Sequence, residues 1–225
     1  MAFSQETLDF LAENKLRGDK DWFHEHNKEY VKYVKEPFYA LCNELSSTML
    51  SIDDALIVEP KRCLSRIYRD TRFTKDKSLY RSNMWLTFIR DKKLSDGLPG
   101  FFFELGLWGF RYGCGYYCTG TDRMKVFREM LIDGEPKAKK AFESFYEQDV
   151  FELTGDMYKR PKYTQYGEEM RQWLDRKDIC FMRTSDDYDM LYSDKLADLL
   201  KKDFVLLRDQ YEFMMSVEAR FNKVV

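Results

Sequence analysis

Arginine and lysine side chains are concentrated in one stretch of sixteen residues, Arg66 to Arg81. Its six cations are Arg66, Arg69, Arg72, Lys75, Lys77 and Arg81, and its two carboxylates are Asp70 and Asp76. A guanidinium group binds phosphate or carboxylate through paired hydrogen bonds, and lysine adds positive charge around the same anion. The stretch therefore predicts a binding site for a small phosphorylated or otherwise anionic ligand.

The spacing of these cations indicates how they could converge. Arg66, Arg69, Arg72 and Lys75 recur every three residues, which matches neither one face of a strand nor a stable stripe of a helix. An irregular segment that leads into a strand would let at least three of the cations point into one cleft. The expected ligand-binding residues are Arg66, Arg69, Arg72, Lys75, Lys77, Tyr80, Arg81 and Arg111.

Other interpretations of the same stretch stay open. The cations could form an internal ion-pair network with Asp70, Asp76 and an acid elsewhere such as Glu104. Asp70 or Asp76 could instead hold a divalent metal in an enzyme, or His26 could act as an acid or base. No cysteine or histidine pair has the spacing of a metal site, so no metal ligand is assigned, and catalytic residues and cofactors are left unknown. A role in binding a partner protein is a further alternative.

The composition limits the class of protein. The 37 lysines and arginines against 39 acids give a net charge of −2, so nucleic-acid binding through an overall basic surface is not expected. Five scattered cysteines favour a reducing compartment, and no signal peptide or membrane span is predicted. We expect a cytoplasmic protein with no membrane partner, and the oligomeric state is open.

The hydrophobic periodicity predicts which elements must position the charged stretch. It is helical up to about Ile52, alternates through the middle of the chain, and is helical again after Ser193. Ser4 and Gly18 predict the ends of a first helix, and Asp19 predicts the start of a second. Residues 55–58 and 83–90 are predicted as strands, and residues 151–153 and 157–159 as a small hairpin. This order predicts a single α+β domain over residues 1–225. We expect a central antiparallel sheet with the N-terminal and C-terminal helices packed on it.

The predicted strand from Trp108 to Cys118 has one bulky face and one face with several glycines. Arg111, Gly113 and Gly115 share the glycine face, because successive side chains of a strand point in opposite directions. Glycine lets another group approach the backbone closely. We expect this face to adjoin the charged stretch at the ligand site.

Several segments resemble a known family. They are R-D-T-R-F-T-K-D-K-S-L-Y-R from Arg69 to Arg81, Trp22-Phe23 with His26 and Tyr30, the Pro99-Gly100-Phe101-Phe102 segment, the glycine-rich strand from Gly113 to Tyr117, and G-D-M-Y-K-R from Gly155 to Arg160. Together they resemble an uncharacterised, mainly bacterial family, domain of unknown function 2461, over nearly the whole chain. The resemblance implies one continuous fold and a cytosolic location, and it implies no activity or catalytic residue.

Overall fold

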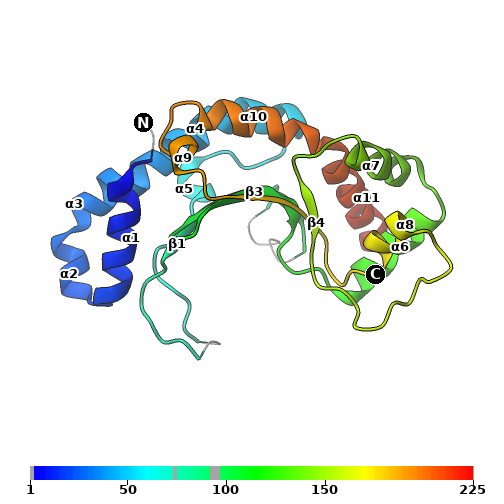
Figure 1. Ribbon diagram of the computed structural model, residues 1–225, viewed down its shortest axis with the longest axis horizontal. Helices are drawn as coiled ribbons and strands as arrows, with labels where there is room; N and C mark the ends of the chain where they lie inside the picture. Colours follow the sequence, from blue (N-terminus) through cyan, green and yellow to red (C-terminus); the bar gives the residue numbers. More distant parts are fainter. Residues whose placement is uncertain (1–2, 73–74, 92–96, 225) are drawn as a thin grey trace. The chain divides into compact units, whose positions relative to one another are not determined.

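A five-stranded antiparallel sheet with helices around it forms the fold of the computed structural model, which describes residues 3–72, 75–91 and 97–224 (Figure 1). The strands are β1 (Asn83–Phe88), β2 (Pro99–Gly106), β3 (Gly109–Tyr116), β4 (Glu152–Thr154) and β5 (Cys180–Ser185), in the spatial order β1-β2-β3-β5-β4. The helices are α1 (Gln5–Arg17), α2 (Lys20–Glu25), α3 (Asn27–Glu29), the π-helix η1 (Tyr30–Lys35), α4 (Glu36–Ile52), α5 (Pro60–Cys63), α6 (Thr121–Ile132), α7 (Pro136–Tyr146), α8 (Glu168–Leu174), α9 (Tyr188–Leu191), α10 (Leu196–Leu206) and α11 (Arg208–Val224). The α+β class predicted from the sequence is confirmed.

The chain divides into two compact units. Strands β2, β3 and β5 each contribute residues to both units. The first comprises Met1–Phe88, Phe102–Tyr112 and Thr184–Lys201, and the second comprises Ile89–Phe101, Gly113–Arg183 and Lys202–Val225. The expectation of a single domain over residues 1–225 stays a prediction.

Local sequence signals set the helices of the first unit. Ser4 and Thr7 form a capping box at the start of α1, and Gly18 ends that helix with a φ of 59°. The Asp19 side chain then accepts a hydrogen bond from the backbone nitrogen of Trp22 at 2.8 Å and caps α2. Since proline is tolerated only in the first turn of a helix, Pro37 places the start of α4 next to it.

An irregular hairpin, which we call the arm (residues 64–72 and 75–86), includes the start of β1 at its second side (Figure 1). Its two sides pair at Leu64 with Leu86 and at Tyr68 with Tyr80. Three residues lie between the bridges on the first side and five on the second, so the second side carries two extra residues, as in a β-bulge. The arm therefore presents the charged stretch on an extended segment, which is compatible with the irregular geometry expected from the spacing.

Aromatic side chains fill the core of the second unit. Trp173 on α8 is fully buried, with ring centroids of Phe127, Phe145 and Phe181 between 5.2 and 6.1 Å away. The buried guanidinium of Arg128 donates to the carbonyl oxygen of Leu174 at 2.7 Å. The end of α8 is thus fixed by both apolar packing and a buried polar contact.

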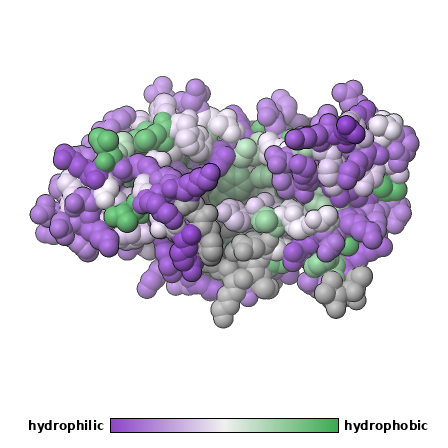
Figure 2. Space-filling model, turned by 90° about the horizontal axis from the view of Figure 1, so that it is seen from below, coloured by the Kyte–Doolittle hydropathy of each residue, from purple (hydrophilic) through white to green (hydrophobic). Residues whose placement is uncertain are grey.

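Hydrophilic residues predominate on the face drawn in Figure 2, and hydrophobic residues occur there in smaller groups. Among the helices that the structure describes, none combines the length and apolar character needed to cross a membrane.

Candidate functional site

Aromatic rings attach the arm to α2. The ring of Tyr80 lies 5.0 Å from those of Phe23 and Tyr68, measured between centroids, and Tyr80 is fully buried. Burial raises the pKa of the Tyr80 hydroxyl, so it stays protonated. Tyr80, which was predicted to bind ligand, is thus a core residue that positions the arm, while Tyr68 beside it is 43% exposed.

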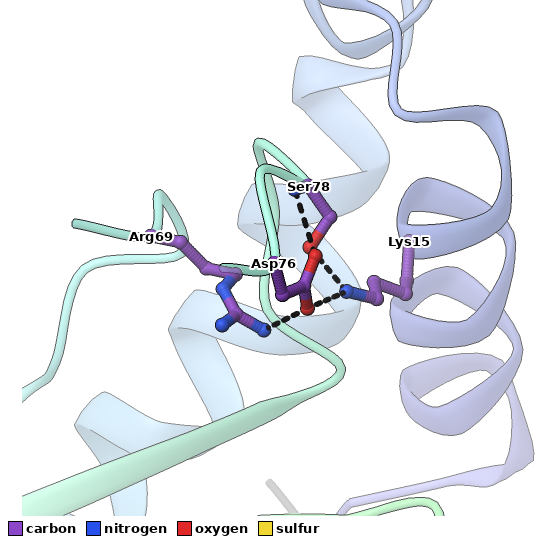
Figure 3. A network of polar contacts seen from close by, with 4 residues as sticks. All are labelled: Lys15, Arg69, Asp76 and Ser78. Atoms are coloured by element: carbon purple, nitrogen blue, oxygen red, sulfur yellow. Dashed lines mark hydrogen bonds and ion pairs between the residues drawn. The ribbon is translucent and has the colours of Figure 1, made fainter. Parts of the chain in front are cut away.

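Asp76 lies at the centre of a polar cluster (Figure 3). Its Oδ2 is 2.7 Å from Nη1 of Arg69 and 3.4 Å from Nζ of Lys15, and Lys15 also donates to the hydroxyl of Ser78. The backbone nitrogen of Ser78 donates to Oδ1 at 2.9 Å, and these contacts lower the pKa of Asp76 to about 2. The cluster joins both sides of the arm to α1.

Asp70 forms a second ion pair on the arm. Its two carboxylate oxygens accept hydrogen bonds from Nε and Nη2 of Arg72, the shorter at 2.7 Å. The hydrogen bonds from Arg72, with a smaller contribution from the charge of Arg81, lower the pKa of Asp70 to about 2. Arg72 remains 76% exposed, so the pair is solvated and contributes little to stability.

The remaining cations of the stretch have different surroundings. Nζ of Lys77 donates to the carbonyl oxygen of Thr71 at 2.7 Å, and the guanidinium of Arg81 lies 4.7 Å from the ring centroid of Trp85. Arg66 and Lys75 are exposed. The internal ion-pair network that was weighed as an alternative therefore involves Arg69 and Arg72, while the arm carries four further cations.

Arg111 is held within the sheet region of the first unit. Its Nε lies 2.5 Å from Oε2 of Glu104, and its guanidinium stacks 5.2 Å from the ring centroid of Trp108. Asn83 donates to the other oxygen of Glu104. Glu104, which was considered a partner for the arginines of the charged stretch, is thus paired with Arg111.

The glycine face of β3 is occupied by β5. A Cβ atom on Gly113 would overlap the carbonyl oxygen of Phe181, and one on Gly115 would lie 2.7 Å from the Cα atom of Cys180. The sequence indicated a close approach to this backbone, and the approaching group is a neighbouring strand. Gly113 and Gly115 therefore serve strand packing and leave no room there for a ligand.

This packing predicts a stability effect. Gly113→Ala is expected to lower the free energy of unfolding by about 1–3 kcal/mol, because overpacking forces β3 and β5 apart. Urea denaturation measures the change. Gly167→Ala is the control, since its Cβ meets no atom within 4 Å, and we expect a change within about 0.5 kcal/mol. Equal stability of the two variants would contradict the packing role of Gly113.

The metal and acid-base alternatives gain no support from geometry. Within the described parts of the chain, no group of three or more histidine, cysteine or acidic residues could hold a metal ion. Asp70 and Asp76 each already pair with cations. The His26 ring stacks on Trp22 at 4.2 Å, and its Nδ1 lies 2.8 Å from the carbonyl oxygen of the same residue.

A cavity of about 240 Å³ lies beside α1, away from the predicted ligand-binding residues. It is lined by Gln5, Leu8, Asp9, Ala12, Leu107 and Tyr188. Lys15, the cation that α1 contributes to the Asp76 cluster, was missed by sequence reasoning. It is 61 residues from Asp76, and no local pattern indicates a contact over that separation.

The chain matches a family of known sequences. A family model described as a conserved hypothetical protein, DUF2461, matches residues 6–213. No curated protein matches the chain.

Proposed function

The chain belongs to the DUF2461 family of conserved hypothetical proteins, and from that premise we propose that its arm binds a small phosphorylated or otherwise anionic ligand. The excess of cations supports this function. Six lysines and arginines face two carboxylates between Arg66 and Arg81, a net charge of +4. Asp76 pairs with Arg69 and Asp70 pairs with Arg72, so each of the two carboxylates already has a cation of the arm beside it.

The mixture of donors fits an oxyanion. Arginine offers paired N–H groups to phosphate oxygens, and lysine contributes a point charge. Arg66, Lys75 and Lys77 are exposed, so a ligand reaches them without displacing the core. A small anion is favoured over nucleic acid because the chain as a whole is slightly acidic.

We propose a cytoplasmic location together with this function. All five cysteines carry free thiols, which suits a reducing compartment. Phosphorylated metabolites and nucleotides are the proposed ligand class, and no membrane partner is proposed.

The proposed function predicts stabilisation by phosphorylated small molecules. At a concentration of 100 times the dissociation constant, a ligand stabilises the protein by about 2.7 kcal/mol. For a chain of this length, this corresponds to a rise in melting temperature of roughly 5–10 °C. We expect Arg69→Ala to weaken binding at least about tenfold, the effect of losing one charge-assisted hydrogen bond.

Arg220→Ala is the matched control. Arg220 is also a partly exposed arginine paired with an acid, Glu135, and it lies on α11 rather than on the arm. Calorimetric titration with nucleotides, sugar phosphates and an oligonucleotide separates the ligand sources. The proposal fails if no small anion binds, if both variants weaken binding equally, or if only the oligonucleotide binds.

A further inference from the structure

Lys15, Arg69 and Ser78 surround the carboxylate of Asp76 (Figure 3). Lys15 approaches from α1, Arg69 from the first side of the arm, and Ser78 from the second side. Two cations are therefore directed at one place, where Oδ2 of Asp76 now lies, and the Ser78 hydroxyl beside them accepts a hydrogen bond from Lys15. We call Lys15, Arg69 and Ser78 the anion seat.

Lys15 and Arg69 are more buried than Arg72 of the arm, so their charges are less hydrated and gain more from a neighbouring anion. The side chains of Lys15 and Arg69 are 30% and 26% exposed, whereas that of Arg72 is 76% exposed. Partial loss of hydration raises the energy of an unpaired charge. Asp76 supplies the countercharge, and because its own side chain is 50% exposed, an anion from solvent can reach the same place.

Resting on the proposed function, we propose that the anion seat binds a dianionic phosphate group and that Asp76 occupies it as an internal competitor until the ligand arrives. The tetrahedral oxygens of a phosphate monoester can accept from Lys15, Arg69 and Ser78 together. On displacement, the Asp76 carboxylate turns to solvent, and no covalent bond changes.

The tethered carboxylate sets the ligand class. A tethered group competes with an effective concentration in the millimolar range or above. A free monocarboxylate carries the same charge as Asp76, so it gains nothing by exchanging with it. A dianion brings one more negative charge to the two cations, and this difference favours phosphate monoesters and sulfate over carboxylates.

Asp76→Asn separates competition from structure. An asparagine Oδ1 still accepts the hydrogen bond from the backbone nitrogen of Ser78, which Asp76 receives at 2.9 Å, so the turn is kept. The negative charge that competes for Lys15 and Arg69 is lost. We expect Asp76→Asn to bind glycerol phosphate about tenfold more tightly than the wild type, and to bind acetate measurably.

Two further variants test the seat itself. Lys15→Met is expected to weaken glycerol phosphate binding about tenfold. Asp70→Asn is the matched control, because it removes the same charge from the same arm, and an asparagine Oδ1 can keep the hydrogen bond from the backbone nitrogen of Arg72. We expect Asp70→Asn to change the affinity less than twofold.

The pH dependence supplies a second readout. The pKa of Asp76 is held at about 2, so this competitor stays ionised between pH 5 and 8. The second pKa of a phosphate monoester is about 6, so glycerol phosphate gains its second charge over that range. We expect its affinity to rise from pH 5 to pH 8, while the affinity for sulfate, a dianion throughout, stays constant.

The outcomes distinguish the two proposals. Suppose that the wild type binds glycerol phosphate and that Arg69→Ala lowers the affinity, but that Lys15→Met and Asp76→Asn leave the affinity unchanged. The anion seat is then wrong and the proposed function stands. An equal gain in affinity for glycerol phosphate in Asp70→Asn and Asp76→Asn also overturns the anion seat. If neither wild type nor Asp76→Asn binds glycerol phosphate, sulfate or acetate, the anion seat is wrong, and if nucleotides and sugar phosphates also fail to bind, both proposals fail.

Discussion

Replacing Arg123 by methionine is expected to lower the free energy of unfolding by about 3–5 kcal/mol, because it leaves a buried carboxylate without its cation. Nε of Arg123 lies 2.8 Å from Oε2 of Glu218, whose side chain is only 3% exposed. The guanidinium also stacks on Phe221, 4.7 Å from its ring centroid. Methionine keeps much of the apolar contact of the side chain and removes the charge.

The groups around Glu218 offer little compensation for that loss. The hydroxyl of Tyr116 donates to the carbonyl oxygen of Met214 at 3.1 Å, and burial, followed by the charge of Glu218, raises its pKa well above the usual value. Tyr116 is therefore a neutral neighbour. Oε1 of Glu218 has no hydrogen-bond partner among the described residues, so this carboxylate depends on Arg123.

Urea denaturation at pH 7.5 measures the effect, with Arg123→Met/Glu218→Gln as the control. The double variant contains neither charge, and we expect it to recover most of the lost stability. A loss below about 1 kcal/mol, or strictly additive effects in the double variant, would mean that the pair does not stabilise the second unit.

Local signals allowed several elements of this fold to be predicted. Helix caps involve residues within a few positions of one another, so Ser4, Gly18 and Asp19 indicated the boundaries of α1 and α2 correctly. The strand predicted from Asn83 corresponds to β1, since its alternating burial is visible in the sequence. Residues 55–58 were predicted as a short strand and form none, because a short apolar run does not specify a pairing partner.

Long-range pairing explains the other differences. A hairpin was expected between residues 151–153 and 157–159, but β4 pairs with β5, with Leu153 opposite Phe181. Met157 forms a bridge with Arg176 instead. The choice between a near and a distant partner strand depends on what both faces bury, and the local sequence does not contain that information.

The charged stretch shows the same division between local and long-range information. Its cations could be read from the sequence, and so could their local acids, Asp70 and Asp76. Which of these residues pair with one another and which are buried could not be predicted from the sequence. Lys15 reaches the stretch from α1, and Tyr80 is buried against Phe23. The site could therefore be predicted as a set of charges, and its geometry required the fold.

Trp173→Ala is expected to cost about 3–5 kcal/mol of unfolding free energy, as for other fully buried large aromatic side chains. Trp173 is 0% exposed and packs against rings from α6, α7 and β5. Removing the indole leaves a cavity among rings whose positions are fixed by three elements, so the surroundings cannot collapse fully into it. The melting temperature should fall by roughly 6–20 °C.

Tyr117→Ala provides the control for Trp173→Ala, because it also removes a large aromatic side chain from the second unit. Tyr117 is 86% exposed, so we expect its replacement to change the unfolding free energy by less than about 0.5 kcal/mol. Trp173→Phe should fall between wild type and Trp173→Ala, since a phenyl ring fills part of the cavity. If Trp173→Ala and Tyr117→Ala unfold at the same urea concentration, Trp173 does not organise the core of the second unit.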